Sequence, residues 1–277
     1  IKGKGVSFIE NKETMHGKPL SKEELEKALK EIKYTSLKLK SNVKYKEIVH
    51  KFSDYTTNKY KLGEMIATRE AFGRGLANLG EKNKDAVVLD GDVKNSTRTE
   101  YFFKKFPERS IECFIAEQNM AGMAVGLSAQ GFTPYVATFA AFLTRAHDFI
   151  RMAMYSKANI KFIGSHAGIS IGEDGPSQMG LEDIAMFLSM PDSVILYPSD
   201  AVSAESLLKE MAKHTGISYL RTTRNKTPVI YENKEKFCIG GLKVLRKSTK
   251  DKALVIGAGE TSELAAVHLN SRNIGKI

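Results

Sequence analysis

Residues 134–163 have the sequence PYVATFAAFLTRAHDFIRMAMYSKANIKFI, and the fold class follows from it. The stretch contains two short apolar runs, at 134–138 and 160–163, on either side of a helical pattern at 144–155. Apolar runs without polar alternation are typical of strands buried on both faces, and a helix commonly connects two such strands of a parallel sheet. The stretch therefore predicts a strand–helix–strand unit.

The same alternation extends towards both ends of the chain. Helical patterns occur at 69–79, where Gly80 is expected just after the helix, and at 201–211. We therefore predict an α/β fold with a doubly wound, mostly parallel sheet and helices on both faces. Four further apolar runs predict strands at 86–89, 111–115, 194–197 and 217–220.

Two segments outside this region predict additional parts. Ser21 and Glu24 have the spacing of a capping box, which predicts a helix from there to about Ile32, and the residues up to Lys61 are expected to form a linker with short helical pieces. After a second linker at 231–237, the apolar run 253–256 predicts a strand followed by a helix. One strand and one helix cannot bury a sheet, so we expect a truncated second α/β unit.

Composition excludes several classes of protein. The 277 residues are 42% hydrophobic, no apolar run approaches the roughly 20 residues that span a bilayer, and the start, which is not Met, lacks the apolar stretch of a signal peptide. We expect a fragment of a cytoplasmic protein that does not act at a membrane.

Cys113 and Cys238 are too far apart in sequence for a CxxC pair. The net charge of +10 comes mostly from lysines interleaved with glutamates before residue 62, without a nucleic-acid-binding motif. This favours anionic sugar phosphates over nucleic acid as ligands.

Polar residues gather where the predicted strands end. Ligand sites of open parallel sheets form beyond the carboxyl ends of the strands, so these residues are expected at one edge. Carboxylates, aromatic rings, hydroxyls and arginines together favour a polyhydroxylated, anionic ligand. The residues are Asp90, Asp92, Asn95 and Ser96; Glu117; Phe139 and Phe142; Ser165, His166 and the glycine-rich loop 171–178; and Arg221 and Arg224.

Glu117 has two interpretations. It follows an apolar run and precedes a helix with many small residues, so a half-buried carboxylate here would have a raised pKa and could share a proton with a ring nitrogen. An acid at a helix N-terminus is also favoured by the helix dipole alone. Spacing leaves both interpretations open.

The sequence resembles transketolase along its whole length. This resemblance implies a thiamine-diphosphate-binding fold, with the tail of the diphosphate-binding domain at 1–33, an interdomain linker at 34–64, the pyrimidine-binding domain at 65–232 and the start of the C-terminal domain at 233–277. The segment GEDGPSQ at 172–178 is the most specific. The others are KGKG at 2–5, HGKPL at 16–20, LDGD at 89–92, NST at 95–97, IAEQNM at 115–120, TFAAF at 138–142, GSH at 164–166, QMGLED at 178–183 and YPSD at 197–200.

Catalytic and cofactor roles follow from the resemblance. Glu117 matches the glutamate that faces the aminopyrimidine of thiamine diphosphate and shares its proton, which favours the ring form that activates the thiazolium carbon. Phe142 matches the aromatic that stacks on the pyrimidine, although core packing would also explain it, and Phe139 lies nearby. His16 matches a histidine that contacts cofactor and substrate as an acid–base group; as a lone loop histidine it would otherwise be a surface residue. The remaining cofactor-binding residues would be Lys2, Asp92 and Gln178.

Substrate-binding roles follow in the same way. Arginine forks with hydroxyl and imidazole donors suit a phosphate dianion. Asp174 matches a carboxylate that hydrogen-bonds a substrate hydroxyl. His50, His147, His214 and His268 have no such match and are expected to be structural. The residues that match the sugar-phosphate group are Arg69, Ser96, His166 and Arg224.

The chain is not expected to hold the metal itself. The family binds its diphosphate through Mg²⁺ (or Ca²⁺) with a Gly-Asp-Gly motif, which Gly91-Asp92-Val93 breaks, and Gly257-Ala258-Gly259 is only a weak dinucleotide-binding pattern. The resemblance implies a homodimer with the site at the subunit interface. The reaction would be reversible transfer of a two-carbon ketol group from xylulose 5-phosphate to ribose 5-phosphate or erythrose 4-phosphate in the pentose phosphate pathway. The chain alone is expected to be inactive.

Two kinds of alternative remain. Deoxyxylulose-phosphate synthase, dihydroxyacetone synthase and the β subunit of ketoacid dehydrogenases share the pyrimidine domain, but His16 together with the segments at 164–166 and 172–178 favours transketolase. The alternative of a different class is a non-catalytic paralogue that binds a partner. Intact Glu117, His166 and Arg224 argue against it.

Overall fold

The computed structural model describes residues 3–12, 17–32, 48–247, 249 and 251–262, and the chain divides into two compact units, Ile1–Glu47 and Ile48–Ile277. The first unit contains helix α1 (Lys22–Glu31). The predicted capping box at its start is confirmed, since Ser21 accepts from the backbone N–H of Glu24 and the Glu24 carboxylate accepts from the N–H of Ser21. The Glu31 carboxylate accepts from the backbone N–H and hydroxyl of Ser7, at 2.5 and 2.8 Å.

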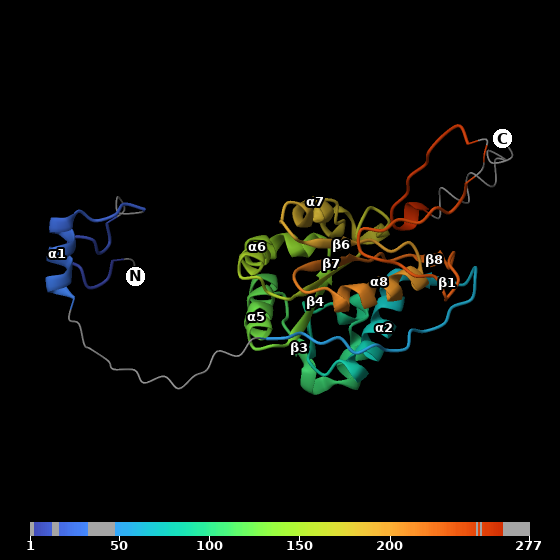
Figure 1. The fold of residues 1–277 in the computed structure, drawn as a ribbon, viewed down its shortest axis with the longest axis horizontal. Helices are drawn as coiled ribbons and strands as arrows, with labels where there is room; N and C mark the ends of the chain where they lie inside the picture. The colour runs from blue at the N-terminus through green and yellow to red at the C-terminus, as the bar shows by residue number, and fades with distance from the viewer. Residues whose placement is uncertain (1–2, 13–16, 33–47, 248, 250, 263–277) are drawn as a thin grey trace. The chain divides into compact units, whose positions relative to one another are not determined.

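The second unit is built on a six-stranded parallel sheet with the order β3-β2-β4-β5-β7-β6. In Figure 1 the labels β3, β4, β7 and β6 follow one another upwards in this order. All six strands predicted from the apolar runs are present. The strand order departs from the chain order, as expected for a doubly wound sheet. The strands are β2 (Ala86–Asp90), β3 (Ser110–Glu112), β4 (Thr133–Phe139), β5 (Lys161–Ser165), β6 (Val194–Leu196) and β7 (Ser218–Arg221).

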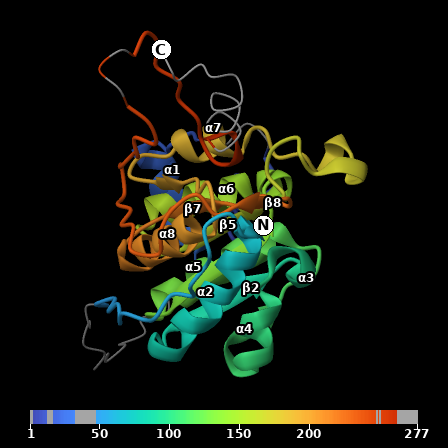
Figure 2. The ribbon, with the colours of Figure 1, turned by 90° about the vertical axis from the view of Figure 1, so that its right-hand side faces the viewer.

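Helices cover both faces of this sheet, as predicted. Val87 and Leu89 of β2 pack on the face covered by α5 (Glu117–Ala129), α6 (His147–Tyr155) and α7 (Asp183–Leu188). Ala86 and Val88 point to the other face, which is covered by α2 (Thr68–Lys82), α4 (Glu100–Lys105) and α8 (Ala201–Lys213). On this second face α2 lies between α4 and α8 (Figure 2). The alternation of neighbouring β2 residues between two apolar cores explains why the strand is apolar throughout.

Helix boundaries differ from the predictions at two places. Gly80 does not follow α2 but lies inside it, and a Cβ atom there would clash with the ring of Phe102, so this glycine allows close packing of α4. The helical pattern at 144–155 is divided into the 3₁₀ helix η3 (Ala141–Ala146) and α6. The other short helices are α3 (Lys94–Thr97), η2 (Pro107–Arg109), η4 (Gly172–Asp174) and η5 (Pro176–Gln178).

A two-stranded antiparallel ribbon was not predicted. It joins β1 (Met65–Ala67), directly before α2, to β8 (Lys226–Pro228), which follows β7, with Ala67 opposite Lys226. The described part of the linker, residues 48–61, contains no helix, in contrast to the short helical pieces expected there.

The strand predicted at 253–256 is wrong. Residues 251–258 have no regular secondary structure, and Leu254 is 85% exposed. An apolar run forms a strand only where a neighbouring strand satisfies its backbone groups, and the structure gives this run none among the described residues.

Within the described ranges, no helix combines the length and the apolar character needed to cross a membrane.

Candidate functional site

A row of three stacked rings lies where β4 and β5 end. The ring of Phe139 stacks on that of Phe142 at 5.0 Å and 13°, and on the imidazole of His166 at 4.0 Å and 14°. Phe139 is the last residue of β4 and pairs with Ser165, the last residue of β5, so the parallel register brings Phe139 beside His166. Phe139 is buried, but Phe142 remains partly exposed. The outer ring of the row is therefore available to a planar ligand.

Glu117 is the first residue of α5 and is only 3% exposed. Its carboxylate lies 3.4 Å from Nε of Arg145, whose side chain is 64% exposed. Arg145 and Phe142 both belong to η3, so the short helix that provides the outer ring also provides the arginine beside the Glu117 carboxylate. The acid is therefore buried and also begins a helix, and this geometry does not decide between the two interpretations of Glu117.

This arrangement fits an aminopyrimidine. A buried carboxylate normally has several hydrogen-bond donors, whereas the structure gives Glu117 one mostly exposed arginine among the described residues. A ring N–H would supply the missing donor, and Phe142 would supply a stacking face. Arg145 was not predicted, because its relation to Glu117 depends on how η3 packs against α5.

Two of the predicted phosphate ligands are joined by a hydrogen bond. Arg69, in the first turn of α2, donates from Nη1 to the backbone carbonyl of Ser96 at 2.8 Å. Its Nε is buried and has no acceptor among the described residues. Burial, Arg98 and Arg224 lower the pKa of Arg69, so an anion bound here would relieve repulsion between cations.

Arg224 is held by the glycine-rich loop. Its Nη2 lies 2.8 Å from Glu173 and its Nη1 lies 3.5 Å from Asp174, while Nη1 also donates to the carbonyl of Ile171. The structure thus places Arg224 beside Asp174. A phosphate that binds Arg224 must replace part of these contacts.

His166 is 2% exposed and adopts a left-handed backbone conformation with φ of 56°. Burial, followed by the charges of Arg69, Arg224 and Arg98, lowers the pKa of His166 to about 3. The imidazole is therefore neutral at physiological pH. Its Nδ1 lies 2.9 Å from the Ser165 hydroxyl.

Two of the predicted cofactor-binding residues, Asp92 and Gln178, contact residues outside the predicted site. Asp92 is exposed, with φ of 66°, and its N–H donates to Glu112 at 3.0 Å. Gln178 is partly buried and accepts from the Ser177 hydroxyl. Neither forms a hydrogen bond or ion pair with another predicted site residue among those described. Lys2 and His16 lie outside the described residues.

Two buried aspartates support the site, and the sequence analysis did not assign these roles. Asp90 accepts hydrogen bonds of 2.7 Å from the hydroxyls of Thr97 and Thr99 and from the N–H of Val93, and so fixes the loop that carries Ser96. Burial raises the pKa of Asp90 to about 6. The signal was present, since an aspartate at a strand end precedes two threonines.

Asp183 is the second supporting acid. It accepts from the Tyr219 hydroxyl at 2.6 Å and from Nε of Arg221 at 2.8 Å, and Arg221 also donates to the carbonyl of Gly180 at 3.0 Å. Arg221, which the sequence placed at the ligand edge, is thus buried and used to hold the segment that follows the glycine-rich loop.

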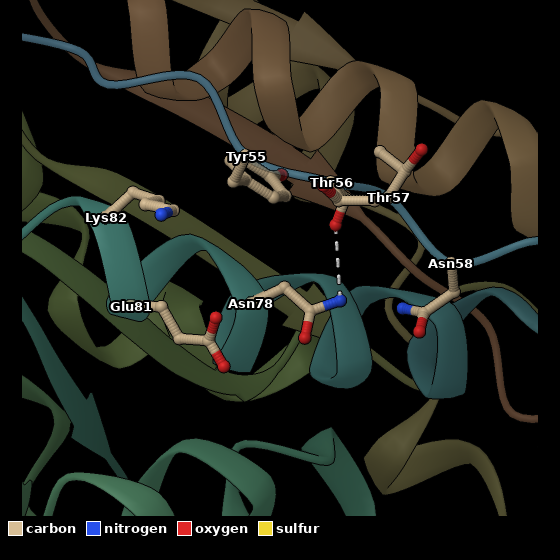
Figure 3. Close-up of a pocket in the computed structure, with 7 residues that line it drawn as sticks. All are labelled: Tyr55, Thr56, Thr57, Asn58, Asn78, Glu81 and Lys82. Carbon is tan, nitrogen blue, oxygen red and sulfur yellow. Dashed lines mark hydrogen bonds between the residues drawn. The ribbon is translucent and has the colours of Figure 1, made fainter.

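Two pockets of the described part of this unit lie against α2. One, of about 380 Å³, lies at the β1–β8 ribbon and the first half of α2, and includes Arg69 and Arg224 in its lining. The other, of about 200 Å³, lies between residues 55–58 and the end of α2, where Asn78 donates to the carbonyl of Thr56 at 3.4 Å (Figure 3). No cluster of three or more histidine, cysteine or acidic side chains that could hold a metal occurs among the described residues.

Comparisons with known proteins identify the family of the chain. Residues 64–229 match the family described as "Transketolase, pyrimidine binding domain". Mouse transketolase-like protein 2 is 50% identical over 276 residues, covering 96% of this chain and 44% of the relative. Human transketolase is 46% identical over 280 residues, covering 97% and 45%. The chain therefore spans less than half the length of these relatives.

The solved structures that resemble this chain include two transketolases. A split-gene transketolase, described as an inactive β4 tetramer, is similar with a TM-score of 0.60 and 39% identity, over 66% of this chain and 60% of its own. Transketolase from Leishmania mexicana is similar with a TM-score of 0.57 and 25% identity, over 62% of this chain and 27% of its own.

Proposed function

Because the chain belongs to the transketolase family, we propose that it forms the pyrimidine-binding part of a thiamine-diphosphate-dependent ketol transferase. The proposed reaction is the reversible transfer of a two-carbon ketol group from a ketose phosphate such as xylulose 5-phosphate. The acceptor is an aldose phosphate such as ribose 5-phosphate or erythrose 4-phosphate, as in the cytoplasmic pentose phosphate pathway. The observation that carries the proposal is the buried Glu117 carboxylate, which lies against the helix that presents Phe142.

Glu117 and Phe142 are proposed to hold the pyrimidine end of the cofactor. When bound, thiamine diphosphate supplies the carbanion chemistry of the reaction. Glu117 exchanges a proton with a ring nitrogen, and its burial strengthens that interaction because the local dielectric constant is low. Phe142 contributes its partly exposed face. Asp92 and Gln178 are proposed as further cofactor contacts.

Arg69, Ser96, His166 and Arg224 are proposed to bind the sugar phosphate. The two guanidinium groups provide charge, and the neutral imidazole of His166 provides one donor without adding to the repulsion between Arg69 and Arg224. Asp174 is proposed to accept from a substrate hydroxyl. Because Asp174 and Glu173 pair with Arg224, the glycine-rich loop is expected to rearrange when a phosphate arrives.

The rest of the assembly is proposed from the family. Residues 1–33 would end the diphosphate-binding domain, 34–64 would be the interdomain linker, 65–232 the pyrimidine-binding domain, and 233–277 the start of the C-terminal domain. Lys2 and His16 would act at the diphosphate and at the substrate. Mg²⁺ would be held outside this chain, and the active form would be a homodimer with the site at the subunit interface. The chain alone is expected to be inactive.

A coupled assay of the complete protein, with saturating thiamine diphosphate and Mg²⁺, tests the proposal. Glu117→Ala should lower kcat by at least about 100-fold, because a positioned proton-transfer group contributes roughly that much. Glu108→Ala is the matched control, since Glu108 is exposed and lies on η2, away from the site. Near-normal turnover of Glu117→Ala would contradict the proposal.

A partner-binding paralogue without activity is the second outcome that the assay separates. It predicts no ketol transfer by the unaltered protein and no binding of thiamine diphosphate. Weak turnover with tight cofactor binding would instead indicate another acceptor, to be identified by comparing an aldose phosphate, formaldehyde, and glyceraldehyde phosphate with pyruvate.

A further inference from the structure

Two buried threonines directly precede the two arginines that are proposed to bind the sugar phosphate. Thr68 precedes Arg69 at the start of α2, and Thr223 precedes Arg224 shortly after the end of β7. The threonines are only 1% and 2% exposed. The backbone that carries each arginine is therefore anchored in the protein interior.

These two threonines contact each other. The Thr68 hydroxyl accepts a hydrogen bond of 3.0 Å from the backbone N–H of Thr223, and the two hydroxyl oxygens lie 3.1 Å apart. A hydroxyl near a helix start commonly caps that helix, but α2 begins after Ala67 without a side-chain cap. The Thr68 hydroxyl instead joins the start of α2 to the segment that follows β7.

Backbone pairing holds the same segment on either side of the threonine contact. Before it, the N–H of Thr222 donates to the carbonyl of Gly164 in β5 at 2.9 Å. After it, the ribbon of β1 and β8 places Lys226 opposite Ala67. The threonine contact lies between these two pairings, at the residue next to Arg224. It is therefore placed to fix how far the backbone at Arg224 stands from the start of α2.

This spacing matters because the two arginines repel each other. Arg69 and Arg224 both line the pocket of about 380 Å³. Burial, followed by the charges of Arg98 and Arg224, lowers the pKa of Arg69, so the guanidinium groups act on one another. An uncharged hydrogen bond between the adjacent residues opposes this repulsion without neutralising either arginine. Both guanidinium groups are thus held for one ligand before it binds, which lowers the entropy cost of binding.

We propose that Thr68 is a positioning residue, which sets the spacing of the Arg69 and Arg224 guanidinium groups by fixing the backbone of Thr223. The inference rests on the proposed function, because it takes both arginines as ligands of the sugar phosphate. Thr68 itself does not contact the substrate. Loss of its hydroxyl should therefore weaken the use of phosphorylated sugars and leave the use of unphosphorylated sugars unchanged.

Steady-state kinetics of the complete protein with ribose 5-phosphate and with ribose as acceptors test this role. The donor, xylulose 5-phosphate, is kept well above its own KM in each variant. Thr68→Val keeps the shape of the side chain but removes the acceptor of the Thr223 N–H. It should raise KM for ribose 5-phosphate by about ten-fold, as expected when one charge-assisted hydrogen bond to the phosphate is weakened, with kcat/KM for ribose unchanged. Thr68→Ser retains the hydroxyl and should restore the KM of the unaltered protein.

Thr133→Val is the matched control. Thr133 is also buried, and its hydroxyl donates to Asp85 at 2.8 Å, but it is the first residue of β4, at the opposite end of that strand from Phe139. Thr133→Val should lower stability in urea unfolding without changing KM. A merely structural role of Thr68 would give the same result as this control, because a smaller folded fraction lowers kcat equally for both acceptors.

A double-mutant cycle shows whether Thr68 acts through Arg224. If it does, Thr68→Val should add little to the rise in KM caused by Arg224→Gln, whereas additive effects would overturn the proposal. If Thr68→Val does not fold, Thr223→Val replaces it in the test, because it removes only the 3.1 Å hydroxyl contact. Thr223→Val should raise KM for ribose 5-phosphate by about three-fold, as expected for the loss of a neutral hydrogen bond.

An unchanged KM for ribose 5-phosphate in Thr68→Val, or in Thr223→Val where Thr68→Val does not fold, would overturn the proposal. Equal losses with ribose 5-phosphate and ribose would also overturn it. Neither result affects the proposed function, which the unaltered protein and Arg224→Gln test separately. Absence of ketol transfer by the unaltered protein, or an unchanged KM in Arg224→Gln, would refute the proposed function or its phosphate ligand, and this inference with it.

Discussion

The pKa of Asp90 depends on two opposing effects, the cost of burying its carboxylate and the stabilisation of that carboxylate by hydrogen bonds. Its carboxyl group is fully buried, and burial raises its pKa from 3.8 to about 6, although two threonine hydroxyls and one N–H donate to it. A raised pKa in the folded state means that the protonated form stabilises the fold. That stabilisation is fully present below pH 3.8 and is lost as the pH rises through about 6.

The magnitude follows from the size of the shift. A shift from 3.8 to about 6 is roughly two pKa units, and each unit corresponds to about 1.4 kcal/mol, so Asp90 should contribute about 3 kcal/mol of pH-dependent stability. The difference in free energy of unfolding between the unaltered chain and Asp90→Asn isolates this contribution. It should fall by about 3 kcal/mol between pH 3.5 and pH 7.5, because the asparagine does not titrate.

Urea unfolding followed by circular dichroism at several pH values measures this difference. Asp148→Asn is the control, because the Asp148 side chain is 80% exposed and the same subtraction should give a nearly flat profile. A flat profile for Asp90→Asn would show that the three hydrogen bonds cancel the cost of burial. A difference that rises with pH would show that they outweigh it, and the reasoning would be refuted.

Three further outcomes are expected. Gly80→Ala should lower the free energy of unfolding by about 1–3 kcal/mol, measured by thermal or urea unfolding, because the added Cβ would meet Phe102. Gly126→Ala is the control: Gly126 is also inside a helix but has no atom near the added Cβ, so the substitution should change stability little or raise it by up to about 1 kcal/mol. Equal effects of the two substitutions would contradict the packing argument. Asp183→Asn should lower the free energy of unfolding by about 3–5 kcal/mol, because Arg221 would keep its buried charge without a charged partner. A loss below about 1 kcal/mol would show that water solvates the pair. Burial lowers the pKa of Lys161 to about 7, so above pH 7 the unfolded chain binds more protons than the folded chain. The free energy of unfolding of the unaltered chain, relative to that of Lys161→Met, should therefore rise from pH 7 to pH 10. A fall over that range would be inconsistent with this pKa.

The parallel strands could be predicted because the four inner strands β2, β4, β5 and β7 are buried throughout, while the edge strands β3 and β6 are partly buried but overlap largely apolar runs. Such strands appear as continuous apolar runs, and β2 shows the reason, since its successive residues enter two different cores. The ribbon of β1 and β8 could not be predicted in this way. Both strands have only three residues, and Met65 and Lys226 are exposed, so neither has an apolar pattern.

Predictions about side chains depended on their distance from the strand ends. The stack of Phe139 and His166 follows from a parallel register that aligns the ends of β4 and β5, so their proximity was predictable. The contact between Arg145 and Glu117 depends on how η3 packs on α5, and the tie between Arg221 and Asp183 depends on where α7 begins. The spacing of these residues in the sequence predicts neither contact.

The exchange of the thiazolium C2 proton with deuterium, followed by NMR in the complete protein with bound thiamine diphosphate, tests the role of Glu117 most directly. The account predicts that Glu117→Gln slows this exchange by at least about 100-fold, while cofactor binding persists and Glu108→Gln has no effect. Exchange as fast in Glu117→Gln as in the unaltered protein would contradict it.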